Sequence, residues 1–153
     1  MNMRGKKAGR WDLLVILLIL QGVGAIYGGG TMVIDPSGEL LGTDTSILKN
    51  WPVDSFLIPG IILLLVLGVL PLVVASGMIK RWNWALAEKL NLFPALHWSW
   101  AFSLYIGFAL IIWINVQMYV LSGVGIVHLG YVALGLAIQA VAVLPGVQKN
   151  YSK

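Results

Sequence analysis

The chain has 153 residues, of which 59% are hydrophobic and 10% are charged, and its mean hydropathy is +0.88. Soluble domains carry about 25% charged residues, so this composition argues against a soluble fold and predicts one integral membrane domain over residues 1–153. The absence of cysteine excludes disulfides and thiol-ligated metals, and the net charge of +4 indicates membrane topology and not nucleic-acid binding, because the basic residues flank apolar runs.

Four segments are apolar for long enough to cross a bilayer, which takes about 20 residues at a rise of about 1.5 Å per residue. They cover residues 11–30, 56–76, 100–121 and 124–144. We therefore expect an all-α fold, a bundle of four transmembrane helices. Residues 31–55 would form an outer loop, and residues 77–99 would form an interfacial segment on the other side of the membrane.

The first span follows a basic stretch, as the apolar part of a signal peptide does. Its apolar run is too long for a signal peptide and ends in three glycines without a cleavage pattern, so we expect a retained helix. Gln21, Gly24 and Gly28 share one face of this helix. The Gly24–Gly28 pair is a GxxxG motif, which permits another helix to approach closely.

The loop after the first span is acidic and rich in turn-forming residues. Asp35, Pro36 and Gly38 occupy the first, second and fourth positions of a type I turn. Gly42 then permits a second bend. These residues predict an ordered loop whose chemistry is mainly geometric.

A short interfacial helix over residues 43–51 is expected next, with Asp44 as its N-cap. Its apolar side chains would face the membrane; they are Ile47, Leu48 and Trp51. Asp54 is placed to cap the second span, and Pro59 falls early enough in that helix to be tolerated.

The second span carries a stripe of mostly small residues at helical spacing. The stripe consists of Gly60, Leu64, Gly68, Pro71 and Ala75. Pro71 has no backbone N–H, so it leaves the carbonyl group of Leu67 without its usual helical partner. We expect this face to pack closely against another helix.

Four tryptophans surround the segment between the second and third spans, and they predict an aromatic belt at the membrane interface. They are Trp82, Trp84, Trp98 and Trp100. Asn83 is a candidate N-cap for a short interfacial helix over residues 84–92, and Pro94 would start the third span.

Polar side chains inside the spans are candidates for function, because hydrocarbon penalises them. No charged residue lies in a span interior, and the amide and imidazole side chains there are Gln21, Asn115, Gln117, His128 and Gln139. On the fourth span, His128, Tyr131, Gly135 and Gln139 form one stripe. Two interpretations stay open: interhelical hydrogen bonds worth about 0.6 kcal/mol each, or a pocket for a lipid or small molecule.

Metal and catalytic patterns are weak. His97 and His128 are predicted at opposite sides of the membrane, so they cannot ligate one haem iron, and we expect no cofactor. No nucleophile has a plausible base and acid beside it, which leans against an enzyme.

Orientation follows from the distribution of Lys and Arg. Nine of the ten lie at the N-terminus, in 77–99 or at the C-terminus, whereas Lys49 shares the loop at 31–55 with four acidic residues. The positive-inside rule therefore predicts a multi-pass plasma-membrane protein with both termini in the cytoplasm.

The chain resembles a group of small bacterial four-helix membrane proteins. The resemblance rests on the pattern DPSG, LG, FLIPG and WIxVQ, which here covers Asp35 to Gly38, Leu41-Gly42, Phe56 to Gly60 and Trp113 to Gln117. It implies an architecture of four helices, internal termini and an ordered outer loop, and it does not indicate an activity.

Three functions are compatible with these patterns. The first is a non-enzymatic subunit that binds another membrane protein or its own copy. The second is a lipid- or quinone-binding protein, and the third is a transporter or channel component acting as an oligomer. The candidate ligand-binding residues are Trp113, Asn115, Gln117, His128, Tyr131 and Gln139, whereas Gln21, Gly24, Gly28, Gly68 and Pro71 are assigned to helix packing.

Overall fold

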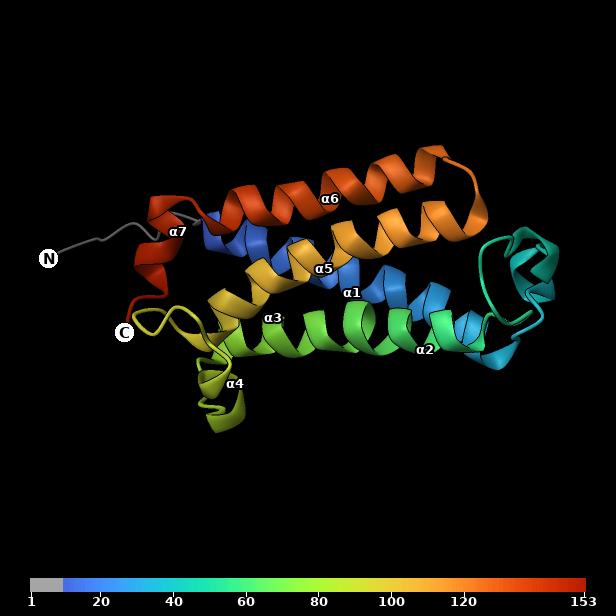
Figure 1. Ribbon diagram of the computed structural model, residues 1–153. Coiled ribbons are helices and arrows are strands. Elements are labelled where there is room, and N and C mark those ends of the chain that lie inside the picture. Colours follow the sequence, from blue (N-terminus) through green and yellow to red (C-terminus); the bar gives the residue numbers. More distant parts are fainter. Residues whose placement is uncertain (1–9) are drawn as a thin grey trace, which may run out of the picture.

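Helices make up most of the computed structural model, which describes residues 10–153, with side chains described from residue 13 onward. Three of the N-terminal basic residues that contributed to the predicted orientation lie outside this part: Arg4, Lys6 and Lys7. Four long helical segments run antiparallel to their neighbours in the chain (Figure 1). They are α1 (Arg10–Ile34), a second helix composed of α2 (Leu57–Leu64), the π-helix η3 (Leu65–Val69) and α3 (Leu70–Lys80), then α5 (Trp98–Leu121) and α6 (Ile126–Ala142).

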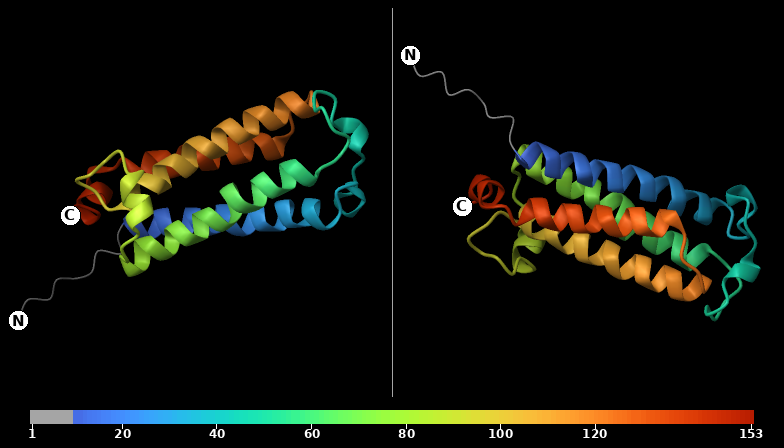
Figure 2. Two further views of the ribbon diagram at one scale, coloured as in Figure 1. Left: turned by 60° about the horizontal axis from the view of Figure 1, so that its bottom comes forward. Right: turned by 90° about the horizontal axis from the view of Figure 1, so that it is seen from above.

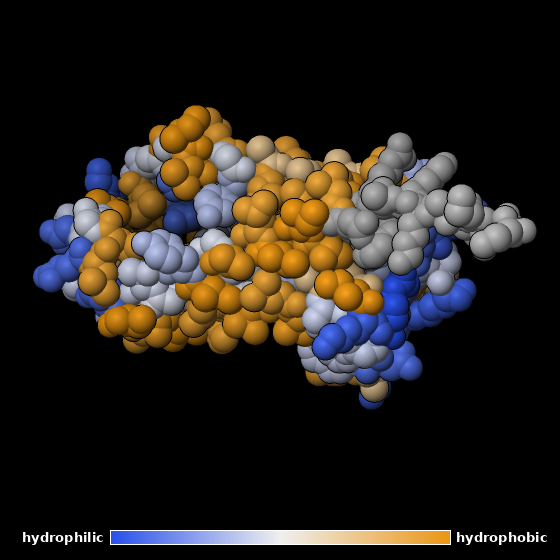
Figure 3. Space-filling view, turned by 180° about the vertical axis from the view of Figure 1, so that it is seen from behind, coloured by the Kyte–Doolittle hydropathy of each residue, from blue (hydrophilic) through white to orange (hydrophobic). Residues whose placement is uncertain are grey.

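The described residues form an all-α protein of the kind expected for a polytopic membrane protein. Three helical segments are long and apolar enough to cross a bilayer: Leu13–Ile34, Leu57–Lys80 and Trp98–Leu121. The apolar helix Ile126–Ala142 has 17 residues, which gives a length of about 25 Å. Figure 3 shows an apolar band across the middle of one face, between more hydrophilic ends.

Several predicted boundaries need correction. The first helix continues through its three glycines to Ile34, so the loop begins at Asp35. Pro94 does not start the third helix, which begins at Trp98 with His97 as its N-cap. The short helix α4 (Ala85–Lys89) has Trp84 at its N-cap position without a side-chain cap, so Asn83 does not cap it.

Closely packed glycines join α1 to the second helix. A Cβ atom on Gly29 would lie 2.5 Å from the backbone nitrogen of Leu64, and one on Gly22 would lie 2.9 Å from the carbonyl oxygen of Gly68. These two glycines, and not the predicted Gly24–Gly28 pair, mark the closest approach: a Cβ atom on Gly24 would meet the Tyr131 hydroxyl of α6, and one on Gly28 would lie 3.5 Å from a methyl group of Leu63. On the second helix, a Cβ atom on Gly68 would lie 2.9 Å from a side-chain carbon of Ile26 on α1.

Pro71 is predicted to leave the carbonyl group of Leu67 without its helical hydrogen bond, and the structure shows how this carbonyl is paired instead. The chain before this buried proline is wound as a π-helix, in which the N–H of Leu70 donates to the carbonyl of Leu65. The carbonyl oxygen of Leu67 accepts a hydrogen bond of 3.3 Å from the side-chain amide of Gln21 on α1. The proline thus exposes a carbonyl group that a neighbouring helix satisfies.

One end of the bundle, which we call the tryptophan end, contains α4, α7 (Pro145–Asn150) and the start of α5 (Figure 2). Trp98 is 0% exposed, and its indole N–H donates to the carbonyl of Trp82; the indole N–H of Trp100 donates to the carbonyl of Ala142. These two tryptophans are therefore buried in protein, and the predicted interfacial belt is wrong for them.

The C-terminal residues dock at the tryptophan end. The backbone N–H of His97 donates to the carbonyl of Tyr151, and that of Lys153 donates to the carbonyl of Ala95. The Arg81 guanidinium lies 4.0 Å from the centre of the buried Tyr151 ring. This segment joins α7 to the connection before α5.

The opposite end, which we call the loop end, is formed by residues 35–56 and the helix ends that they join. Gly38 donates its N–H to the carbonyl of Asp35 at 3.2 Å, which is the hydrogen bond of the predicted turn, and its φ of 89° is one that glycine adopts readily. The Asp35 carboxylate accepts hydrogen bonds from Ser37 and from the backbone of Leu40, and these bonds hold its pKa below the ordinary value. Gly42 makes the second bend with a φ of 65°.

The rest of this loop folds inward. Asp44 does cap a helix, but only the 3₁₀ turn η2 (Thr45–Ile47), which follows η1 (Glu39–Leu41). The predicted membrane-facing residues instead pack against Phe56 and Val120; they are Ile47, Leu48 and Trp51. Asp54 is exposed and does not cap the second helix, because the Ser55 hydroxyl accepts the N–H of Leu57. Pro59 lies in the first turn of α2, as predicted.

Candidate ligand-binding site

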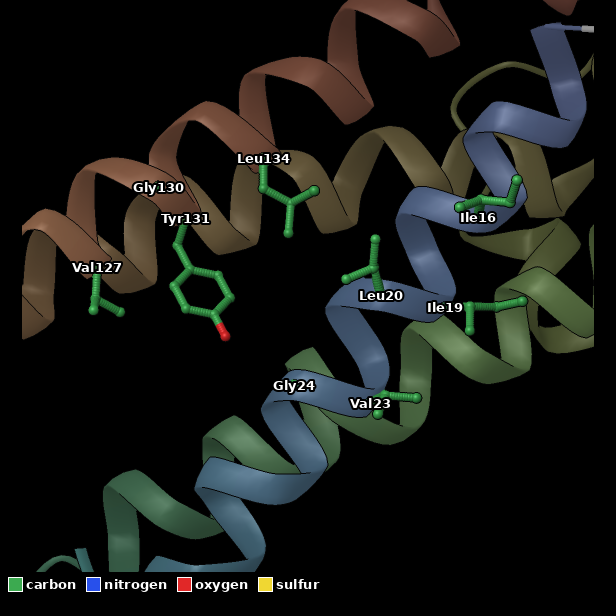
Figure 4. A pocket seen from close by; sticks show the side chains of 9 residues that line it. All are labelled: Ile16, Ile19, Leu20, Val23, Gly24, Val127, Gly130, Tyr131 and Leu134. Atoms are coloured by element: carbon green, nitrogen blue, oxygen red, sulfur yellow. The ribbon is translucent and has the colours of Figure 1, made fainter.

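An open groove of about 650 Å³ separates α1 from α6. In Figure 4, the Tyr131 ring extends from α6 into this gap toward Gly24. The α1 side of the groove is apolar and faces outward, since Leu20 is 60% and Val23 57% exposed. Groove residues on the two helices are Ile16, Ile19, Leu20, Val23, Gly24, Val127, Gly130, Tyr131 and Leu134.

A second, more enclosed space of about 170 Å³ lies deeper between the helices, and we call it the inner cavity. It shares Gly24, Val127 and Tyr131 with the groove, so the two have common walls. Its lining comes from α1, α2, α5 and α6: Gln21, Gly24, Ala25, Gly28, Met32, Leu63, Leu110, Trp113, Ile114, Gln117, Val127, His128 and Tyr131.

Four of the six predicted ligand-binding residues line this cavity. Trp113 and Gln117 are one turn apart on α5, and His128 and Tyr131 are one turn apart on α6. Three residues assigned to packing from the sequence line it as well; they are Gln21, Gly24 and Gly28. The periodicity of each helix shows which residues share a face but not which faces meet.

The remaining two candidates lie elsewhere. Asn115 is exposed, and its amide donates to the carbonyl of Ile111 one turn earlier in its own helix. Gln139 packs against Gly107, where α5 and α6 are in contact, and lines none of the three spaces described here. The predicted stripe on α6 therefore has two parts: His128 and Tyr131 line the inner cavity, whereas Gly135 and Gln139 pack against α5.

Two buried polar atoms of the inner cavity have no hydrogen-bond partner in the described part of the chain. One is Oε1 of Gln21, a residue that is 1% exposed and whose amide nitrogen is already engaged by Leu67. The other is Nε1 of Trp113. An unpaired buried polar group is costly, so these two lining residues contribute one acceptor and one donor whose hydrogen bonds a bound molecule can satisfy.

Imidazole and phenol groups complete the polar lining. Nδ1 of His128 accepts the backbone N–H of Gly125 at 3.0 Å, which places the proton of a neutral ring on Nε2. The Tyr131 hydroxyl lies 3.0 Å from where a Cβ atom on Gly24 would be. No lining residue of the groove or the inner cavity is Asp, Glu, Lys or Arg.

A third space of about 180 Å³, the loop cavity, lies under residues 41–56. It shares Met32, Trp113 and Gln117 with the inner cavity. Nε1 of Trp51, another buried donor without a partner among the described residues, belongs to a residue of its wall. The sequence does not mark Trp51 as a cavity residue, because an aromatic residue in an apolar stripe also suits a membrane surface.

The two histidines lie at opposite ends of the bundle, as predicted. His97 precedes α5, whereas His128 is in the first turn of the antiparallel α6. Among the side chains described, those of residues 13–153, no group of three or more His, Asp or Glu is close enough to hold a metal ion.

Comparison of the chain with protein-family models, with curated proteins and with solved structures finds no match. The geometry of the groove and cavities is therefore the basis on which a function can be argued.

Proposed function

We propose that this protein is a non-enzymatic, multi-pass membrane protein that binds a neutral amphiphile of lipid or quinone type between α1, α5 and α6. The observation that carries the proposal is the continuity of an apolar groove with a cavity that contains unpaired polar atoms. The groove would hold the apolar chain of the ligand, and the inner cavity would hold its head.

The sizes of the two spaces support this division. Pockets that enclose a drug-sized ligand measure roughly 300–1,000 Å³, whereas the inner cavity measures about 170 Å³. A head group fits such a volume, but a complete lipid does not. The adjoining groove of about 650 Å³ has exposed aliphatic walls on α1, and hydrocarbon chains pack well against such walls.

The lining also favours a neutral head. A charged head buried without an opposite charge would be unfavourable in this low-dielectric region. The groove and inner cavity provide amide, indole, imidazole and phenol groups, which hydrogen-bond to hydroxyl or carbonyl oxygens. Phospholipids with anionic heads are therefore poorer candidates.

The proposal includes a topology of four spans with both termini in the cytoplasm and the loop end outside. It is supported by the basic residues that cluster at the tryptophan end and by the acidic residues of the loop end. The helix α6 is shorter than the usual span, which local thinning of the bilayer would accommodate. The same arrangement is implied by the resemblance to small bacterial four-helix proteins.

Native mass spectrometry of the detergent-purified full chain tests ligand binding. We expect the wild type to carry a bound amphiphile, and we expect Gln117→Leu to lose about 90% of it, because the substitution removes a polar group from both cavities. Asn115→Leu is the matched control: it also removes an amide from α5, but at an exposed position.

A second pair of variants tests the groove. Gly24→Leu should displace the ligand, since a side chain there meets the Tyr131 hydroxyl, whereas Gly30→Leu should retain it, since a Cβ atom on Gly30 has no neighbour within 4 Å. A wild-type protein without bound amphiphile, or equal retention in all four variants, would contradict the proposal.

A further inference from the structure

The unpaired atoms of the inner cavity restrict the chemistry of the head group. Gln21 contributes an acceptor, because its amide nitrogen donates to Leu67 and its oxygen remains unpaired among the described residues. Trp113 contributes a donor, because an indole N–H cannot accept. A head that pairs with both atoms must donate one hydrogen bond and accept another.

We infer that the head group carries a free hydroxyl that donates to Oε1 of Gln21, so that the protein distinguishes hydroxyl-bearing amphiphiles from their capped or oxidised counterparts. This inference rests on the proposed function. A diacylglycerol and a quinol share the required hydroxyl. A quinone has only acceptor oxygens and cannot satisfy Gln21.

The geometry around Gln21 makes this selection strict. Its amide cannot simply rotate to present a donor, because that would remove the hydrogen bond to Leu67, whose carbonyl lost its helical partner to Pro71. The residue is 1% exposed, so bulk water does not replace the missing donor. The π-helix thus fixes which end of the Gln21 side chain faces the ligand.

The position of the cavity adds a second requirement. Trp113 lies in the walls of both the inner cavity and the loop cavity, and the indole N–H of Trp51 has no partner among the described residues. A head with a second oxygen could extend from Gln21 past Trp113 toward Trp51. Glycerol and quinol heads both carry oxygens at more than one position, which suits this arrangement.

Binding of matched ligand pairs tests the inference. The full chain in detergent is titrated with dioctanoylglycerol and with its 3-O-methyl ether, and bound fractions are read by native mass spectrometry. A decyl quinol and the corresponding quinone form a second pair, which separates a lipid source from a redox carrier. We expect the hydroxyl member of at least one pair to bind about tenfold more tightly, because the capped form leaves a buried acceptor unpaired.

Variants assign the preference to Gln21. In Gln21→Met, which keeps the side-chain length but removes the acceptor, the tenfold ratio should fall below about threefold. In Trp113→Phe, both members of a pair should bind more weakly by a similar factor, so the ratio persists. Gln139→Met is the control: Gln139 is half-buried where α5 and α6 are in contact and lines none of the three spaces, so its ratio should equal that of the wild type.

The outcomes separate this inference from the proposed function. If capped and uncapped ligands bind equally well to the wild type, the hydroxyl assignment is wrong while amphiphile binding stands. A ratio that is unchanged in Gln21→Met also overturns the assignment. If no member of either pair binds, both proposals fail. Because the ligand pairs are compared first on the wild type, a Gln21 variant that does not fold leaves the main comparison intact.

Discussion

The tryptophan end and the loop end use similar residue types in different ways. At the tryptophan end, the indole groups of Trp98 and Trp100 are buried and donate to backbone carbonyls. Toward the loop end, the indole groups of Trp113 and Trp51 border cavities, and their N–H groups have no partner in the described part of the chain. The same side chain is a structural contact at one end and an available donor at the other.

This difference follows from how far the helices separate. Near the tryptophan end, α1, α3, α5, α6 and α7 contribute to one continuous buried cluster. Toward the loop end, the buried residues divide into two smaller clusters, and the inner cavity and the loop cavity lie beside them. One end therefore provides stability, and the other tolerates space that a ligand can occupy.

The largest expected effect comes from truncating a tryptophan. Trp98→Ala should lower the free energy of unfolding by about 3–5 kcal/mol, because it leaves a large void in the buried cluster. Trp113→Ala should lower it by less, since that side chain already borders two cavities. Unfolding in mixed detergent micelles, followed by circular dichroism, measures both. Equal losses would mean that the two ends do not differ in packing.

A smaller effect is expected from adding a methyl group at each end. A Cβ atom on Gly77 would lie 2.4 Å from the buried Trp98 ring, whereas one on Gly28 would lie 3.5 Å from a methyl group of Leu63. Gly77→Ala should therefore cost about 1–3 kcal/mol through overpacking, and Gly28→Ala should change stability little. The same unfolding assay compares the two variants. A larger loss of stability in Gly28→Ala than in Gly77→Ala would contradict the expectation that the tryptophan end is the more tightly packed.

The sequence predicts the helices better than it predicts their contacts. Apolar length locates the long helices to within a few residues, and Pro71 correctly indicates a free carbonyl on Leu67. Periodicity places Gln21, Gly24 and Gly28 on one face, but it cannot tell whether that face meets a helix or a cavity. Which face of α1 borders the cavity depends on the close contacts at Gly22 and Gly29, which set the position of α1 against the second helix.

The loop residues show a similar limit. Turn geometry is local, so Asp35, Gly38 and Gly42 are predictable from their immediate neighbours. The burial of Leu48 depends on Val120, which is distant in the sequence. An apolar side chain near a membrane can face lipid or protein, and composition does not distinguish these environments.

Acid should weaken the tryptophan end selectively. Burial lowers the pKa of His97, the positive charge of Arg81 lowers it further, and Glu88 partly opposes them. Because the folded pKa lies below the unfolded value of about 6.5, the unfolded chain binds more protons as pH falls below that value. Stability is then present above pH of about 6.5 and decreases as pH falls toward the folded pKa.

Thermal unfolding between pH 7.5 and 5.5 measures this dependence, and His97→Gln should reduce it. Hydrogen bonds from Lys153 and Asn91 hold the pKa of Glu88 below its ordinary value although burial opposes them, so Glu88 titrates below this range. A pH dependence that is equally steep in His97→Gln would assign it to another group.

The smallest expected effect concerns the attachment of the loop to α5. The Asn50 amide donates to the carbonyl of Tyr119 at 2.7 Å and to the Ser122 hydroxyl at 2.9 Å. Asn50→Ala should reduce global stability by about 0.5–1 kcal/mol, because exposed hydrogen bonds exchange readily with water. The rate of backbone hydrogen exchange should nevertheless rise across residues 43–56, because the Asn50 hydrogen bonds hold these residues over the loop cavity. The exchange rate at the tryptophan end should remain unchanged. Asn83→Ala, an exposed substitution at the tryptophan end, is the control; if both variants accelerate exchange in the loop, the attachment is not specific to Asn50.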